Sequence, residues 1–269
     1  MSLTSNRWTE PNFRQAIAWC KARQKQNIQC TIAFLGGIPE DDAQAQLALD
    51  TYMNAIGLIG EQELNTSLTV KPSVLGALLD RVKCRQRTLA IARSAADRNL
   101  ALEIATEGID LVSFALETAV ACAEENKDVI LDLQAYLDRT SEDQKAAAKG
   151  GVKVRLVKGA YFGDVNKHEE IQSRFKSLVE AAAEKSQEVL LGTHDPELIE
   201  WVKAKFRGKK RGVEFGFLKG LSDKTKVELA IQGWRVLEYV PFGEKTEAYV
   251  NRRVKSLKDL EAIGKMPAP

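Results

Sequence analysis

The run from Arg155 to Tyr161 places a cation and a glycine turn at the end of an apolar segment. Every second residue from 152 to 156 is apolar, which predicts a β-strand with one apolar face. Arg155 then points away from that face, where an unpaired guanidinium would be costly to desolvate. Gly159 lets backbone approach whatever lies above the strand. The segment predicts either an anionic or electron-rich ligand held against the backbone, or a structural arginine paired with an acidic neighbour inside a barrel.

Eight short segments of strand character recur along the chain and alternate with segments of helical periodicity, such as 41–59 and 111–125. Eight strand-and-helix units favour a closed (β/α)8 barrel of the α/β class over an open doubly wound sheet, because no strand is followed by GxGxxG. We expect one domain over residues 1–269, with an extra helix in an N-terminal extension, residues 1–28. The expected strands are 31–35, 68–71, 101–105, 129–134, 153–157, 189–193, 213–217 and 236–240.

Barrels of this type carry their chemistry at the carboxyl ends of the strands. A purely structural barrel would fill the inward positions with Val, Ile and Leu, whereas this chain offers polar side chains there, which favours a ligand site. These side chains are Thr69, Lys71, Glu103, Glu107, Asp132, Gln134, Lys153, Arg155, His194, Glu214 and Tyr239.

The composition narrows the class of protein. A chain of 269 residues that is 44% hydrophobic suits one globular domain with a full core. Its net charge of +2 gives no strong field toward nucleic acid. The 4 cysteines lack CxxC spacing, so we expect reduced thiols, a cytoplasmic location and no metal site. We find no signal peptide and no apolar run long enough to span a bilayer, and we expect a soluble protein.

Several motifs follow one another in order along the predicted strands: TVKPSVLG at 69–76, LQAYL at 133–137, RLVKGAY at 155–161, THDP at 193–196, EF at 214–215, YVPFGE at 239–244 and YVNRR at 249–253. Together they resemble those of the proline dehydrogenase family, whose members are flavin-dependent barrels that oxidise proline. The resemblance spans nearly the whole chain.

The resemblance implies that FAD lies across the carboxyl-end mouth of the barrel. A cation near the N1/C2 edge of a flavin stabilises the charge of its reduced form, and Arg155 is the candidate. The implied cofactor contacts are Gln134 and Arg155 on the isoalloxazine, Val157, Gly159, Ala160 and Tyr161 along its path, and Thr193, His194 and Glu214 on the remainder.

The resemblance also implies a substrate half. Arg252 and Arg253 would bind the proline carboxylate, since two adjacent guanidiniums can grip one carboxylate. Tyr239 would pack near the substrate ring, and Lys71 would stand beside the site. Electrons would pass to a quinone or another carrier, and because family members often use membrane quinone, peripheral membrane contact is compatible with the sequence.

The chain departs from the family pattern in this same half. The pattern Ile-Asp-x-Glu reads Ile-Ala-Thr-Glu at 104–107, and the Glu expected three residues after the arginine pair is Ser256. The loss of two acids predicts a lowered pKa for Lys71. Glu103 or Glu107 would stand in for the missing Asp.

Two further departures lie after the sixth and seventh strands. Asp195 replaces the usual Asn, and residues 214–220 read EFGFLKG where the family usually has EFQMLYG.

Three functions are compatible with the sequence, and the first is favoured. It is a dehydrogenase that oxidises L-proline or a closely related cyclic amino acid to 1-pyrroline-5-carboxylate, with hydride passing to flavin N5. The second is a flavin-binding relative without proline turnover. The third is a flavin-free aldolase in which Lys71 or Lys158 forms a Schiff base.

Overall fold

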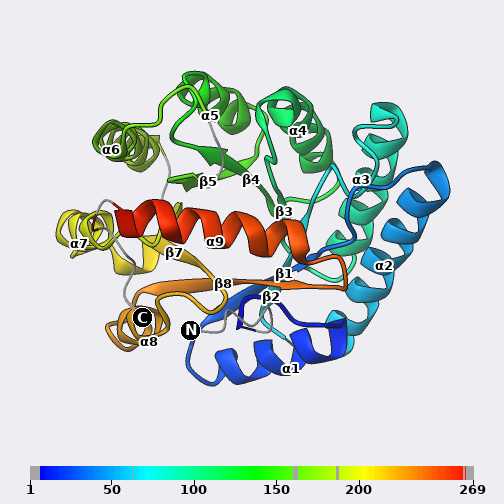
Figure 1. Ribbon diagram of the computed structural model, residues 1–269, viewed down its shortest axis with the longest axis horizontal. Helices are drawn as coiled ribbons and strands as arrows, with labels where there is room; N and C mark the ends of the chain where they lie inside the picture. The colour runs from blue at the N-terminus through cyan, green and yellow to red at the C-terminus, as the bar shows by residue number, and fades with distance from the viewer. Residues whose placement is uncertain (1–6, 63, 160–162, 186–187, 263, 265–269) are drawn as a thin grey trace.

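Eight parallel strands close into a barrel in chain order, with β8 pairing with β1 (Figure 1). This confirms the predicted (β/α)8 fold. The computed structural model describes residues 7–62, 64–159, 163–185, 188–262 and 264, without the side chains of 185 and 259. The strands are β1 Gln29–Phe34, β2 Thr66–Val70, β3 Leu102–Ile104, β4 Val129–Gln134, β5 Lys153–Val157, β6 Val189–Gly192, β7 Val213–Leu218 and β8 Arg235–Phe242.

Helices surround the barrel, and one further helix, α9, lies across the front of the strands in Figure 1. Capping side chains set several of their starts: Asn12, Asp41 and Asp80 each accept a hydrogen bond from a backbone N–H of the helix that follows. The helices are α1 Phe13–Gln24, α2 Asp42–Glu61, α3 Arg81–Ala96, α4 Ile109–Ala123, α5 Thr140–Lys149, α6 His168–Lys185, α7 Pro196–Lys205, the 3₁₀ helix η2 Lys210–Gly212, α8 Asp223–Ile231 and α9 Glu247–Ala262.

The apolar core lies between the strands and the surrounding helices rather than inside the barrel. Leu68 and Leu102 pack against the helices of the first half, and Leu156 and Phe215 against those of the second. The bore is instead lined with polar side chains, as in the hydroxyl contact of 2.7 Å between Thr31 and Thr69. The barrel therefore contributes a rigid frame whose inward positions are available for chemistry.

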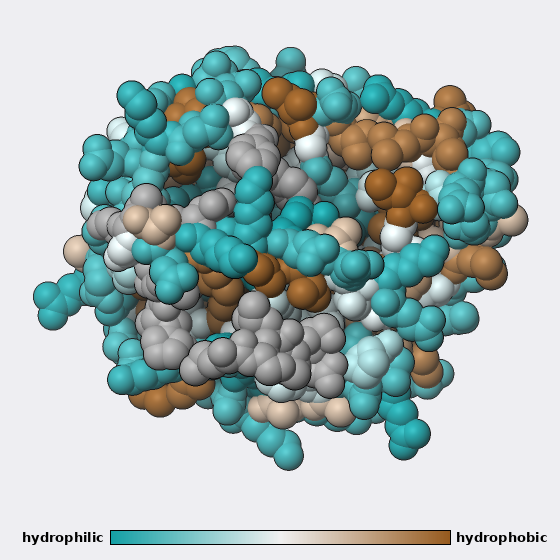
Figure 2. Space-filling view, in the orientation of Figure 1, coloured by the Kyte–Doolittle hydropathy of each residue, from teal (hydrophilic) through white to brown (hydrophobic). Residues whose placement is uncertain are grey.

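Figure 2 shows the face of the molecule on which α9 lies. Its surface carries mainly hydrophilic residues, with hydrophobic ones toward the edge where α2 and α3 run. Among the described residues, no helix is both long and apolar enough to cross a bilayer. Within the same residues, no group of three His, Cys, Asp or Glu side chains is placed to hold a metal ion.

Candidate active site at the carboxyl end of the barrel

Arg155 points into the bore from β5 and is only 4% exposed. Its Nε and Nη2 donate to one carboxylate oxygen of Glu103 at 3.0 and 2.8 Å, and Nη2 lies 3.0 Å from Glu214. Burial acts to lower the pKa of Arg155, but these two carboxylates outweigh it and raise that pKa. Of the two readings left open by the sequence, the structure shows an arginine paired with acids inside the barrel, with Nη1 making only a 3.5 Å contact to the Leu191 carbonyl.

A third carboxylate, Asp132 on β4, faces the same guanidinium at 3.9 Å. Its Oδ1 is buried and has no hydrogen-bond partner in the described part of the chain. Burial and the neighbouring charge of Glu103 raise the pKa of Asp132 well above its ordinary value, and Arg155 opposes them only in part. Glu214 also pairs with Arg235 at 2.8 Å, so it is held by two guanidiniums, whereas Asp132 faces Arg155 only at the longer distance.

Gln134 ends β4 with its side-chain amide engaged by neighbours. Its Nε2 donates to the Thr106 carbonyl at 2.8 Å, and its Oε1 accepts from the Tyr136 hydroxyl. The Tyr136 ring lies against Gly159, where an added Cβ would come within 2.1 Å of it. Gly159 has a φ of +123°, so both its conformation and its surroundings require glycine.

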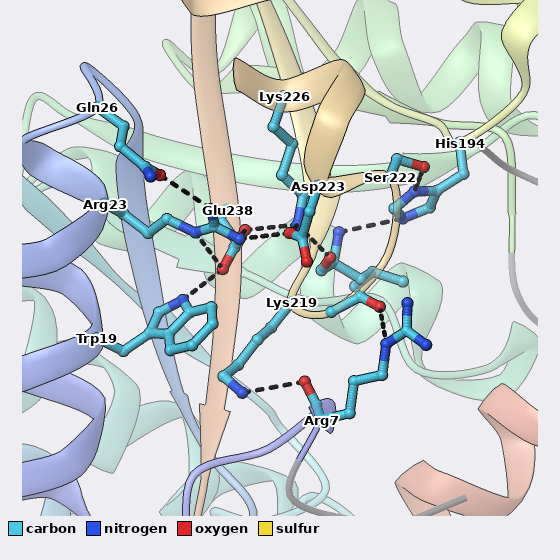
Figure 3. A network of polar contacts seen from close by, with 12 residues as sticks. Arg7, Trp19, Arg23, Gln26, His194, Lys219, Ser222, Asp223, Lys226 and Glu238 are labelled. Carbon is cyan, nitrogen blue, oxygen red and sulfur yellow. Dashed lines mark hydrogen bonds and ion pairs between the residues drawn. The ribbon is translucent and has the colours of Figure 1, made fainter. Parts of the chain in front are cut away.

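His194 follows β6 and is neutral. The Leu218 backbone N–H donates to its Nε2 at 3.1 Å, so the proton is on Nδ1, which donates to the Ser222 hydroxyl at 3.1 Å (Figure 3). Burial, together with the charges of Arg253 and Lys226, lowers its pKa well below the ordinary value. Both ring nitrogens are thus engaged within the protein, and a ligand would meet a carbon edge of the ring.

Lys158 and Asp195 form a separate group on the outer side of β5 and β6. Lys158 Nζ lies 2.6 Å from Asp195, whose other oxygen accepts from the Glu197 N–H at the start of α7. Burial acts to raise the pKa of Asp195, but Lys158 outweighs it and lowers that pKa. An ion-paired lysine is not the neutral amine that a Schiff base requires. Nearby, Thr193 Oγ1 accepts from the Asp195 N–H at 3.1 Å.

The expected substrate residues gather around one aromatic ring, that of Tyr249 on α9. Lys71 Nζ lies 5.9 Å and the Arg253 guanidinium 5.2 Å from its centroid, and the Tyr239 ring lies 6.3 Å away. Lys71 and Arg253 are 7% and 8% exposed, while Arg252 is half-buried. Since Tyr239 is near the end of β8 and Lys71 directly follows β2, α9 covers the carboxyl-end mouth.

The electrostatics of this cluster follow the predicted direction. Burial lowers the pKa of Lys71, Arg252 and Arg253 lower it further, and Glu107 opposes them. Glu107 is held by the Ser73 backbone N–H at 2.8 Å. Of the two acids expected to stand in for the missing Asp, Glu107 therefore faces Lys71, whereas Glu103 is bound to Arg155.

Sequence reasoning missed Tyr249 as the centre of the cluster. The signal was present, because Tyr249 and Arg253 are four residues apart and so share a helix face. The predicted site residues Ala160 and Tyr161 lie outside the described residues. Val157 ends β5 on the inward face, two residues beyond Arg155.

Comparison with known proteins shows the family to which the chain belongs. The family model described as "Proline dehydrogenase" matches residues 16–255. The chain belongs to the proline dehydrogenase family. Proline dehydrogenase 1 of Bacillus subtilis (strain 168) is 27% identical over 252 residues, covering 90% of this chain and 82% of the relative. Proline dehydrogenase of Deinococcus radiodurans is 29% identical over 129 residues, covering 45% of this chain and 42% of the relative.

Solved structures show the same fold. Proline utilization A (PutA) from Bdellovibrio bacteriovorus, inactivated by N-propargylglycine, superposes with a TM-score of 0.84 at 19% identity and covers 93% of this chain. A structure of PutA with proline bound in remote sites has a TM-score of 0.77 at 20% identity and also covers 93%. The chain spans about a third of the length of these PutA chains, 32% and 30% respectively.

Proposed function

We propose that this protein is a flavin-dependent dehydrogenase that oxidises L-proline, or a closely related cyclic amino acid, to 1-pyrroline-5-carboxylate. The observation that carries the proposal is the cluster in which Tyr249 and Arg253 of α9 meet Lys71 and Tyr239 of the barrel. It sets buried cations beside two aromatic rings, which suits a small ligand with a carboxylate and an apolar ring. Family membership and the names of the Bacillus relatives support the same reaction.

Arg252 and Arg253 would hold the substrate carboxylate, and Tyr239 would pack on the ring. Arg253 Nε supports this assignment, because it is buried without a hydrogen-bond partner in the described part of the chain and is available to a ligand. Lys71, with its lowered pKa, would take the proton that the substrate ammonium loses before the hydride leaves the carbon next to nitrogen.

The residues at the ends of β4 to β7 fit a flavin. Arg155 keeps Nη1 without a short contact. Gly159 would let a ligand approach the backbone after β5 once the Tyr136 ring, which lies against it, moves aside. FAD, when bound, would supply the hydride acceptor. Arg155 would stabilise its reduced form, and the other contacts would come from Gln134, Val157, Gly159, Ala160, Tyr161, Thr193, His194 and Glu214. Gln134 would first have to leave Thr106 and Tyr136 to reach the ring.

The reduced flavin would need a second electron carrier, and we propose a quinone or another small electron acceptor. We also propose a cytoplasmic location, with which peripheral contact with a membrane is compatible. We propose no nucleic-acid partner, because a net charge of +2 gives no strong attraction to phosphate backbones.

Anaerobic titration of the purified yellow protein with L-proline tests the proposal. We expect the visible absorbance band of the flavin to disappear, and D-proline to leave it unchanged because the carboxylate would no longer reach the arginines. A yellow protein that stays oxidised with proline and related cyclic amines would instead be a flavin-binding relative without proline turnover. A colourless protein that FAD does not stabilise would contradict both.

A further inference from the structure

Residues Arg7–Glu10, here called the rim segment, are fastened to the loop between β7 and α8. Arg7 Nε donates to the Gly220 carbonyl at 2.8 Å, and Lys219 Nζ donates to the Arg7 carbonyl at 3.0 Å and lies 3.1 Å from Glu10 (Figure 3). Lys219 is only 2% exposed. It occupies the position where the family pattern has Tyr, so this chain uses a departure from that pattern to hold the segment.

The rim segment also pairs with the end of β8. The Glu10 N–H donates to the Pro241 carbonyl at 2.8 Å, and the Gly243 N–H donates to the Glu10 carbonyl at 3.0 Å. Pairing between β7 and β8 ends at Leu218 and Tyr239, and Glu10 lies beside β8 beyond that point, opposite Phe242. These contacts place the segment at the carboxyl-end mouth, on the same rim as the proposed substrate site.

Trp8 extends from this segment beneath α9. Its side chain is 2% exposed and packs in one cluster with Leu35 and Tyr249, against which Tyr239 and Val254 also pack. Tyr249 is the ring that Lys71 and Arg253 approach, so Trp8 shares an apolar cluster with the central ring of the proposed substrate site.

The indole N–H of Trp8 is buried and has no hydrogen-bond partner in the described part of the chain, which is also true of Arg253 Nε. An unsatisfied buried donor is unfavourable, and an apolar ring of similar shape would avoid the cost. Trp8 belongs to the same cluster as Tyr249, and the Arg253 guanidinium lies 5.2 Å from the Tyr249 centroid, so both unpartnered donors belong to residues around one ring. An acceptor of a ligand within reach of both would remove the cost.

We propose that Trp8 is part of the substrate site and donates its indole N–H to the carboxylate that Arg253 holds. A carboxylate accepts up to about four hydrogen bonds, so two arginines that together donate three or fewer leave room for another donor. The inference rests on the proposed function, because it takes the bound carboxylate from there. It adds a residue on which ligand affinity depends.

The test uses the FAD-loaded protein and tetrahydrofuran-2-carboxylate, an analogue of proline whose ring oxygen prevents oxidation. We expect Trp8→Phe, which keeps an aromatic ring but removes the N–H, to weaken binding measured by calorimetry by about 10-fold to 100-fold. The matched control is Trp19→Phe. The Trp19 N–H donates to Glu238 on the outer side of β8, so its loss should leave the dissociation constant unchanged.

Each outcome decides a different question. Wild-type binding with an unchanged dissociation constant in Trp8→Phe overturns the role of Trp8 and leaves the proposed function standing. Absence of binding in the wild type overturns the proposed function and this inference with it. Equal weakening in Trp8→Phe and Trp19→Phe shows a general effect of the N-terminal region and also overturns the role of Trp8.

A second measurement does not require the Trp8 variant to fold. The protein has 4 tryptophans, so ¹⁵N-labelled indoles give as many N–H signals, and Phe variants of the other three identify that of Trp8. We expect the Trp8 signal to move downfield when the analogue binds, while the Trp19 signal stays in place. A Trp8 signal that is unmoved at saturation would overturn the proposal.

Discussion

At the scale of single residues, Arg155 pairs with two buried acids and is also the proposed flavin contact, so an alanine substitution would remove both interactions at once. In Arg155→Ala the carboxylates of Glu103 and Glu214 stay buried without their shared cation, and we expect the free energy of unfolding to fall by about 3 to 5 kcal/mol. Urea unfolding measures this loss. Loss of FAD from that variant could therefore result from weaker folding alone, without a missing contact to the flavin.

Arg252→Ala is the contrasting change, because Arg252 is half-buried on α9. We expect it to keep FAD and unfolding free energy near wild-type values and to raise the KM for proline about tenfold or more, since a charge-assisted contact to the carboxylate is lost. Equal loss of FAD from both variants would show that the flavin and substrate halves are not separated as we propose.

Asp132 gives a further prediction, a dependence of stability on pH. A carboxyl group whose pKa is raised on folding stabilises the folded state at low pH, and this contribution is lost as pH rises from about 4 through the raised pKa. Asp132→Asn cannot ionise and can donate to Glu103. We expect its melting temperature to exceed that of the wild type at pH 8, by the equivalent of about 1 to 3 kcal/mol, and to converge with it near pH 4.

The control is Asp128→Asn, whose side chain is 57% exposed and pairs with Lys153 at the surface. It should shift stability by less than about 1 kcal/mol at any pH. A difference for Asp132→Asn that grows toward low pH would contradict the sign of the argument.

At the scale of elements, α1 and α8 are held to the outside of β8 by one buried carboxylate. Glu238 is fully buried and accepts from the Trp19 indole, Arg23 and Lys226 (Figure 3). In Glu238→Ala, Lys226 is left buried with Asp223 as its remaining acidic partner. We expect the free energy of unfolding, measured with urea, to fall by about 3 to 5 kcal/mol.

The control is Lys224→Ala, which removes an exposed pair with Glu228. It should lower the free energy of unfolding by less than about 1 kcal/mol.

The elements themselves were largely predictable. Each strand carries apolar side chains that pack on the helices, between turn residues or helical segments, so its position was found to within about two residues. The exceptions have local causes. The strand expected at 101–105 is shorter because Thr106 already turns to donate its hydroxyl to the Asp132 carbonyl. The one expected at 236–240 is longer because its last residues continue to pair with β1 and with Glu10.

The extra helix expected in the N-terminal extension, residues 1–28, fills only part of it. It begins at Phe13, because Asn12 caps it, and ends at Gln24, shortly before the left-handed Asn27 with a φ of 57°. Capping and positive φ are single-residue effects that an apolar period does not reveal.

At the scale of the whole molecule, the partners within the site could not be predicted. Arg155 meets Glu103 at a sequence separation of 52, and Trp19 meets Glu238 at 219. The sequence indicated most of the inward side chains, but Lys153, expected among them at the carboxyl end, begins β5 and pairs with Asp128 at the surface. Which acid pairs with which cation depends on the stagger of the closed barrel. The rim segment and α9 lie far apart in the chain, and they meet because the rim segment pairs with the end of β8, which α9 follows.

Closure of the eight strands into one barrel predicts a coupling between cofactor binding and folding. The proposed flavin contacts come from β4 to β7 and their loops, so they exist together only in the closed barrel and FAD should bind the folded state alone. At a free FAD concentration 100 times its dissociation constant, stabilisation is about 2.7 kcal/mol, or a rise in melting temperature of about 5 to 10 °C for a chain of this size. Differential scanning fluorimetry of the flavin-stripped protein measures it. ADP, which offers only the nucleotide half, should give a smaller rise, and equal rises with FAD and ADP would show that the isoalloxazine is not held by Arg155 and its neighbours.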